Sequence, residues 1–333
     1  MLRADAGGAR GSGHVMRCLA LAEAWRAAGG EALLASAELP EPLEARARGL
    51  GVDVRRIAAA SGSNADADCA RALAVGAAAL VVDGYGFGPE YYDLIAGPAP
   101  VLAIDDAGAA PRYAARWILN QNAHAASTLY AAKAPGAELL LGGAYALLRG
   151  EFSELAADGP RAGLFATFGG VDPHGASFRF LDALAHAPAG LDAHLAIGPA
   201  NPRAEELAVR AVDAGAVPLR SPSDMAARLN GAALVVTAGG STLWEGCAAG
   251  APMLVMSVIP EEAMSASALA ARGGCRYVGP LDSLDARRLA DEMADLWQDA
   301  PARATLGAAA RTVVDGEGAA RVAAAILGAE TGR

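Results

Sequence analysis

The sequence predicts an α/β protein with two doubly wound domains, each built on a parallel sheet. Short apolar runs alternate along the chain with longer stretches of helical periodicity, which is the pattern of repeated strand–helix units. Several runs are apolar at every position, as in parallel strands that helices cover on both faces. The 333 residues are also enough for two domains of ordinary size, each with its own core.

The expected strands are spread over both halves of the chain. In the first half they are residues 32–36, 79–83, 101–104, 117–119 and 139–141, and in the second half 164–168, 194–197, 234–237 and 253–256. Helical patterns at 15–28 and 177–186 lie between strands, and only residues 2–4 could form a strand before the first helix. The polar stretch 149–161 separates the halves, so we expect domains at 1–150 and 151–333.

The composition excludes several classes of protein. The formal net charge is −10, whereas nucleic-acid-binding faces need clustered Lys and Arg. No segment approaches the roughly 20 unbroken apolar residues that cross a bilayer, and the N-terminus lacks a signal-peptide pattern. The cysteines stand apart without metal-ligand spacing, which favours buried free thiols at Cys18, Cys69, Cys247 and Cys275. We therefore expect a monomeric cytoplasmic protein with a small-molecule substrate, and without nucleic acid, membrane insertion, cofactor or metal.

A glycine-rich loop, GGARGSGH, runs into the first helical pattern and places His14 at the junction. Its glycines, Gly11 and Gly13 among them, let the backbone turn tightly and approach a ligand. A helix N-terminus attracts an anionic group and disfavours the charged form of a histidine held there. His14 is therefore either a general base or only a helix cap, and the spacing alone does not decide. No Lys-Ser or Lys-Thr follows the loop, so ATP hydrolysis is not expected.

A second loop, TFGGVDP, directly follows the first strand of the second half. Gly169 and Gly170 permit a close approach to a ligand. Asp172 either caps the next helix or holds a ligand hydroxyl, and a turn with a helix cap explains the segment equally well.

The third loop, TAGGSTLWEGCAAGAP, is the most specific of the three. A turn at Gly239 and Gly240 opens a helix at Ser241 and Thr242, where backbone N–H groups and two hydroxyls converge on a candidate diphosphate site. Glu245 lies one turn further along. It is either a partner in a capping box or an acceptor for ribose hydroxyls.

Acidic residues stand at two further strand ends. Asp83 and Tyr85 follow the strand 79–83, and Asp105 with Asp106 follows the strand 101–104. Paired acids are often turn-formers, but these lie on the same rim as His14, so we expect at least one to orient the substrate or the histidine. The remaining histidines form no metal site, although His124 and His174 are candidates for lining the same site; the others are His186 and His194.

Six segments, taken in order, resemble the hydrolases that act on UDP-2,4-diacetamido-2,4,6-trideoxy-β-L-altropyranose in pseudaminic acid biosynthesis. They are GSGHVMRCLALAEAW, VVDGYG, VLAIDD, ILNQN, TFGGVDP and TAGGSTLWEGCAAGAPMLV. The resemblance runs from Arg3 to about Val278, and the ordered set is far more specific than any one segment. It implies the GT-B glycosyltransferase architecture, in which two Rossmann-like domains face one cleft and the C-terminal domain holds most of the nucleotide.

The resemblance also implies residue roles. Water would attack the anomeric carbon of a UDP-sugar with inversion, His14 would be the general base, and Tyr85 would stand at the sugar end. The diphosphate would lie against Gly240, Ser241 and Thr242, and Glu245 would bind the ribose. The resemblance implies no metal, because helix N-terminal dipoles can meet the charge of the departing diphosphate.

The chain departs from this family after the strand 253–256. The family has an acid-Asn-Gln sequence there, whereas this chain has IPEEAMS, so Glu262 and Ala263 stand where amides are expected. A carboxylate at a substrate-binding position beside a diphosphate or sugar weakens binding or changes what is bound. The identity of the sugar therefore stays open.

The main hypothesis is metal-independent hydrolysis of a UDP-sugar. The first alternative is a GT-B glycosyltransferase, in which His14 deprotonates an acceptor hydroxyl instead of water, because one fold serves both reactions. The second alternative is a nucleotide-sugar-binding protein without catalytic activity.

Overall fold

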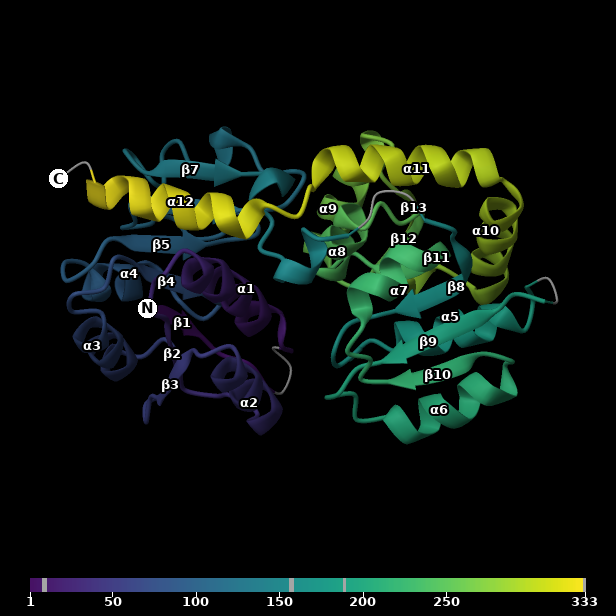
Figure 1. The fold of residues 1–333 in the computed structure, drawn as a ribbon, viewed down its shortest axis with the longest axis horizontal. Helices are drawn as coiled ribbons and strands as arrows, with labels where there is room; N and C mark the ends of the chain where they lie inside the picture. Colours follow the sequence, from purple (N-terminus) through teal and green to yellow (C-terminus); the bar gives the residue numbers. More distant parts are fainter. Residues whose placement is uncertain (8–10, 156–158, 188–189, 332–333) are drawn as a thin grey trace. The chain divides into compact units, whose positions relative to one another are not determined.

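The computed structural model describes the chain except for residues 8–10, 156–158, 188–189 and 332–333 (Figure 1). The chain divides into two compact units, and each has a parallel sheet of its own. Unit 1 contains Met1–Gly150 and Gly316–Arg333, whereas unit 2 contains Glu151–Asp315. No helix in the described part of the chain is long and apolar enough to span a membrane.

Unit 1 is built on a seven-stranded parallel sheet with the strand order β3-β2-β1-β4-β5-β6-β7. Its strands are β1 (Leu2–Ala4), β2 (Leu33–Ser36), β3 (Asp53–Arg56), β4 (Leu80–Asp83), β5 (Val101–Ile104), β6 (Trp117–Asn120) and β7 (Glu138–Leu141). The short strand β1 pairs with both β2 and β4. Residues 2–4 therefore do form the strand that precedes the first helix.

Helices cover both faces of this sheet. They are α1 (Gly13–Ala27), α2 (Glu41–Gly49), α3 (Asn64–Leu73), α4 (Pro89–Ile95) and α12 (Gly318–Thr331). Because successive strand residues point to opposite faces, Val81 and Leu102 join the core under α1, α2 and α12, while Val82 and Ala103 join the core under α3 and α4. This explains why β5, with the sequence VLAI, is apolar at every position.

Unit 2 repeats the design with the strand order β10-β9-β8-β11-β12-β13. Its strands are β8 (Ala162–Thr167), β9 (Ala193–Ile197), β10 (Val217–Arg220), β11 (Ala232–Ala238), β12 (Met253–Ser257) and β13 (Arg276–Pro280). Its helices are α5 (Ala176–Leu184), α6 (Ala204–Asp213), α7 (Met225–Gly231), α8 (Thr242–Ala248), α9 (Pro260–Ala271), α10 (Ala286–Gln298) and α11 (Ala300–Val313). One core lies between the sheet and the helices α5, α6 and α10.

Each strand expected from the sequence forms, with ends within two residues of the expected ones, and the two-sheet α/β fold class is confirmed. The sequence did not predict β3, β10 or β13. All three are edge strands, with sequences DVRR, VPLR and RYVGP and only partial burial. An edge strand that is half exposed lacks the continuous apolar run that identified the others.

The expected domain division at 151–333 differs from the structure at the C-terminus. Helix α12 returns to unit 1, where it packs against α1 (Figure 1). Val322 and Ile326 lie in the same core as Leu19 and Trp117. The sequence analysis identified no boundary here, because the sequence of this segment does not show which of the two cores its apolar side completes.

A buried ion cluster closes the carboxyl end of β1. Arg3 is completely buried and donates to Asp5 at 2.6 and 2.9 Å and to Asp66 at 2.8 and 2.7 Å. Burial alone would raise the pKa of Asp5, but the Arg3 guanidinium and the Ser61 hydroxyl hold it well below its ordinary range. The stabilisation from Asp5 is therefore present above about pH 4 and decreases as the pH falls below that value.

We predict that Arg3→Met lowers the free energy of unfolding of unit 1 by about 3–5 kcal/mol, because two buried carboxylates lose their counter-charge. Urea unfolding followed by circular dichroism measures the change. The control is Arg55→Met on the exposed edge strand β3, which should change the free energy by less than about 0.5 kcal/mol. Equal effects from the two variants would show that the cluster does not stabilise the fold.

Candidate active site

The strand order brings the loops of unit 1 together at one edge of the sheet. β1 and β4 are neighbours, and Ala4 at the end of β1 pairs with Asp83 at the end of β4. After β1 the chain continues to β2 on one side, and after β4 it continues to β5 on the other side. Open α/β sheets bind ligands where the strand order reverses in this way. The loop before α1 and the loop after β4 therefore begin side by side.

His14 is the second residue of α1, and its ring binds Asp83. Its Nδ1 lies 2.8 Å from Asp83 Oδ1, and the residue is 8% exposed. Ser12 is the N-cap residue of this helix, and its side chain makes no capping hydrogen bond. The ring of His14 binds Asp83 and does not cap the helix. Because an ionised carboxylate only accepts hydrogen bonds, it holds the ring proton on Nδ1 and leaves the Nε2 lone pair available.

Arg17 joins Asp83 to Asp106, and sequence reasoning missed it. Its Nε and Nη2 each donate to Asp83 at 2.6 Å, and its Nη1 donates to Asp106 Oδ1 at 2.8 Å. Arg17 lies three residues after His14 in α1, so both side chains leave the same face of the helix. The spacing of three residues between His14 and Arg17 is the sequence feature that could have indicated a role for Arg17.

The charges in this cluster keep the two carboxyl groups ionised. Burial alone would raise the pKa values of Asp83 and Asp106, but Arg17 outweighs burial and lowers both below their ordinary value. Cys18 lies 3.9 Å from Asp83 Oδ2, and burial together with this negative charge raises the pKa of its thiol. Cys18 is therefore a neutral thiol. Among the free cysteines, Cys69 is exposed and the other three are buried.

Tyr85 stands at the exposed side of the cluster. Its hydroxyl donates to Asp106 Oδ2 at 3.0 Å, and its ring meets that of His14 edge-on, with centroids 4.8 Å apart. The residue is 74% exposed. An exposed aromatic ring next to a histidine offers an apolar surface beside the free Nε2.

The two neighbouring acids, Asp105 and Asp106, have different partners. Asp105 accepts from the hydroxyls of Tyr113 at 2.7 Å and Tyr130 at 2.6 Å, so it holds its own loop. Asp106 turns toward Arg17, and Asn122 of the ILNQN segment also donates to it, at 3.0 Å. The sequence indicated that at least one acid would orient the histidine, and Asp106 is the one joined to that cluster.

The glycine loop before α1 is described only in part. Residues 8–10, which include Gly8, lie outside the described residues. Gly11 has a φ of +67°, a left-handed conformation that favours glycine. A Cβ at Gly11 or Gly13 would meet no atom within 4 Å, so both face open space.

Unit 2 has the same strand reversal between β8 and β11. Thr167 near the end of β8 pairs with Thr237 near the end of β11, so the loops with Gly169 and Gly239 begin at one edge. Asp172 accepts from the backbone N–H groups of Ala176 and Ser177 at 2.8 and 2.9 Å. The carboxylate of Asp172 therefore caps α5, which was one of the two interpretations of this loop.

The backbone of Gly170 lies against the next loop. A Cβ on Gly198, in that loop, would stand 2.4 Å from the Gly170 carbonyl oxygen. Two backbone segments therefore touch at this place, and the contact requires glycine at position 198.

Glu262 lies against the turn at Gly239 and Gly240. A Cβ on Gly239 would stand 2.7 Å from the Glu262 carbonyl oxygen, and Glu262 Oε2 accepts from the Val258 N–H at 2.9 Å. Burial raises the pKa of Glu262, although the backbone N–H groups of Val258 and Gly239 and the side chain of His174 act in the opposite direction. Glu262, which we expected to weaken or change substrate binding, thus lies beside the third glycine loop.

Ser241 and Thr242 begin α8 as expected. Ser241 is the N-cap residue, it is exposed, and its side chain makes no capping hydrogen bond. Its hydroxyl is therefore not used by the helix end. Glu245 is half-buried in the first turn of α8.

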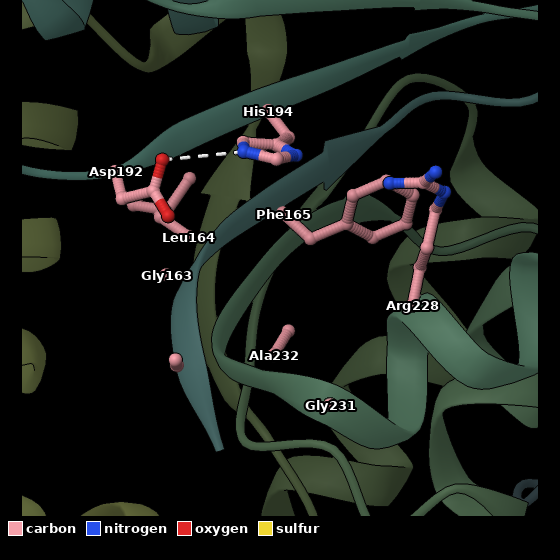
Figure 2. A pocket seen from close by; sticks show the side chains of 9 residues that line it. Gly163, Leu164, Phe165, Asp192, His194, Arg228, Gly231 and Ala232 are labelled. Carbon is pink, nitrogen blue, oxygen red and sulfur yellow. Dashed lines mark hydrogen bonds and ion pairs between the residues drawn. The ribbon is translucent and has the colours of Figure 1, made fainter.

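A pocket in unit 2 lies at the opposite edge of its sheet (Figure 2). It is lined by the first residues of β8 and β11, by Arg228, and by Asp192 with His194, whose ring lies 3.2 Å from the carboxylate. Ligands of open α/β sheets bind at the carboxyl ends of strands, so this pocket is separate from the predicted site. The described residues contain no group of three or more His, Cys, Asp or Glu that could hold a metal ion.

No protein-family model matches the sequence. Among curated proteins, the chain is similar to the spore coat polysaccharide biosynthesis protein SpsG of Bacillus subtilis (strain 168), with 27% identity over 164 residues. The match covers 48% of each chain, so it spans about half the length of that relative.

Solved structures are similar over nearly the whole chain. MurG of Acinetobacter baumannii has a TM-score of 0.67 at 16% identity, with 98% of each chain covered. HepE of Anabaena, in complex with UDP-glucose, has a TM-score of 0.66 at 16% identity and the same coverage. The spinosyn rhamnosyltransferase SpnG has a TM-score of 0.61 at 18% identity, covering 96% of this chain and 99% of its own. The chain therefore has the GT-B fold of these structures.

We predict that Gly239→Ala lowers the free energy of unfolding of unit 2 by about 1–3 kcal/mol, because the new methyl group overlaps backbone atoms of Glu262. Urea unfolding measures the change. Gly240→Ala is the matched control, since its nearest atom is Glu262 Oε1 at 3.3 Å, at the end of a side chain that can move. The two variants should differ clearly, and equal stabilities would refute the backbone contact.

Proposed function

We propose that the protein transfers the sugar of a nucleoside-diphosphate sugar to an oxygen nucleophile, with His14 as the general base. The single observation that carries the proposal is the His14–Asp83 hydrogen bond at the strand reversal of unit 1. The structural neighbours add support, because HepE is seen with UDP-glucose and SpnG is a rhamnosyltransferase.

In the proposed reaction the His14 ring accepts a proton at Nε2, and the inversion is taken from the sequence resemblance. Nε2 takes the proton of a hydroxyl group, and the oxygen attacks the anomeric carbon as the bond to the diphosphate breaks, with inversion. The nucleoside diphosphate leaves with the bonding electrons. Asp83 stabilises the imidazolium that forms, because it accepts the Nδ1–H bond at 2.8 Å and stays ionised beside Arg17. Tyr85 provides an exposed surface for the sugar.

The nucleotide is assigned to unit 2 on the sequence resemblance. The diphosphate lies at the turn of Gly240, Ser241 and Thr242, where an uncapped hydroxyl and helix N–H groups meet its charge. Glu245 receives the ribose hydroxyls. Glu262 next to this turn is protonated more easily than an ordinary glutamate, and this lessens its repulsion of an anion.

The nucleophile is the point on which two candidate functions differ. An alcohol acceptor makes the protein a glycosyltransferase, and the structural neighbours favour this alternative over the hydrolase expected from the sequence. Water makes it a hydrolase of UDP-2,4-diacetamido-2,4,6-trideoxy-β-L-altropyranose. The ordered set of six sequence segments favours this second candidate.

The deciding experiment measures UDP release from UDP-glucose and from the diacetamido sugar nucleotide, without an acceptor, together with calorimetric binding of UDP. Tight UDP binding with release slower than about 0.01 s⁻¹ contradicts hydrolysis, since typical enzymes turn over at about 1–1,000 s⁻¹; it is the result expected of a transferase without its acceptor and of a binding protein without catalytic activity. Release of UDP and free sugar within that range supports hydrolysis. Failure to bind UDP would contradict a UDP-sugar as the substrate of either function.

We predict that His14→Asn lowers kcat by about 10²- to 10⁴-fold and leaves the Kd for UDP within about twofold, because a general base acts only on the reacting proton. Steady-state kinetics and calorimetry measure the two quantities. The control is His194→Asn, since His194 lies at the opposite sheet edge in unit 2. Full turnover in His14→Asn would remove the histidine from the mechanism.

A further inference from the structure

Arg17 has an unusual position between two carboxylates. It binds Asp83 through Nε and Nη2 and Asp106 through Nη1 at 2.8 Å and Nη2 at 3.1 Å. Its side chain is 9% exposed, and those of Asp83 and Asp106 are 0% and 13% exposed. A planar guanidinium can hold two carboxylates in fixed orientations in this way, whereas an ammonium cannot.

One arm of Arg17 acts on the His14 ring. Asp83 Oδ1 accepts both from His14 Nδ1 at 2.8 Å and from Arg17 Nη2 at 2.6 Å. The same Nη2 lies 3.3 Å from His14 Nδ1. Two donors at one oxygen fix the plane of the Asp83 carboxylate relative to the His14 ring.

The other arm acts on Tyr85. Asp106 Oδ2 accepts from both Arg17 and the Tyr85 hydroxyl, at 3.1 and 3.0 Å. The Tyr85 ring lies edge-on to the His14 ring, at an interplanar angle of 86°. The network thus runs from His14 through Asp83, Arg17 and Asp106 to Tyr85, and then back to His14.

We propose that Arg17 is a positioning residue that holds the His14 ring and the exposed Tyr85 ring as one unit. This inference rests on the proposed function for its kinetic consequences. Arg17 keeps Asp83 oriented toward Nδ1, so that Nε2 faces outward.

The contacts of the His14 ring come from two elements. Asp83 and Tyr85 lie at and just after the end of β4, Arg17 lies on α1, and Asp106 is reached through Arg17. Without Arg17, Asp83 and Asp106 lose the donor that they share, and neither carboxylate is held in its orientation toward the two rings. The loss should therefore lower kcat more than it changes KM.

The kinetic test compares Arg17→Met with Arg17→Lys, using UDP-glucose or the diacetamido sugar nucleotide, whichever is turned over. Arg17→Met should lower kcat at least tenfold and leave KM within twofold. Arg17→Lys keeps the charge but not the planar fork, so it should not restore kcat. A wild-type kcat in Arg17→Met would overturn the proposal.

The matched control is Arg26→Met, which removes an exposed arginine from the last turn of the same helix. It should leave kcat and KM unchanged, and circular dichroism shows whether each variant is folded. A loss of kcat in Arg26→Met as large as that in Arg17→Met would show that loss of any nearby positive charge suffices, and this would contradict a specific role for Arg17.

A double-mutant cycle tests the arm toward Tyr85. Tyr85→Phe removes the hydroxyl that donates to Asp106, and Asp106→Asn removes the acceptor's charge. If the two residues act through one contact, the double variant should lose little more activity than the worse single variant. If the double variant loses kcat by the product of the two single losses, the Tyr85 and Asp106 side chains do not act through one contact.

A nuclear magnetic resonance measurement needs no substrate and separates the two proposals. The wild-type protein should show a His14 Nδ1–H resonance that exchanges slowly with water, and Arg17→Met should speed this exchange at least tenfold. An unchanged exchange rate would overturn the role of Arg17. Absence of turnover in the wild-type protein, with the NMR result as expected, would instead overturn the proposed function alone.

Discussion

Both units depend on one constraint, which is the reversal of strand order in a parallel sheet. The chain winds outward from β1 toward β3 and then restarts at β4 on the other side of β1, and unit 2 does the same around β8 and β11. At each reversal the loops following two neighbouring strands separate and leave room for a ligand. His14 and Asp83 come from one such pair of loops, and Gly169 and Gly239 come from the other.

Two clusters of buried charged side chains lie near the reversal of strand order in unit 1. Arg3 lies between Asp5 and Asp66, and Arg17 lies between two carboxylates in the same manner. Buried ion pairs are costly to desolvate, so they are better explained by geometry than by stability. The first cluster fixes the end of β1 and the second fixes the rings next to it. Only the second has an exposed aromatic neighbour, and this distinguishes a candidate site from a structural cluster.

The sequence predicted the central strands because residues such as Val81 and Val82 are buried on both faces, and each strand end then located its acidic or glycine loop. It could not distinguish Asp105 from Asp106, since the choice depends on which loop atoms reach Arg17. It also missed Arg17 itself, because a partner for that side chain exists only after strand pairing has placed Asp83 beside α1. The nucleophile stays open for a different reason, since one base can deprotonate water or an alcohol.

The return of α12 to unit 1 makes unit 2 an insertion within the chain of unit 1. A ribosome therefore completes all of Glu151–Asp315 before it releases the helix that covers Leu19 and Trp117. The second unit can reach its final fold during synthesis, whereas the first, although begun earlier, keeps one side of its apolar core uncovered until α12 has been made. The nascent chain thus acquires its candidate nucleotide half before the half that carries the candidate base is complete.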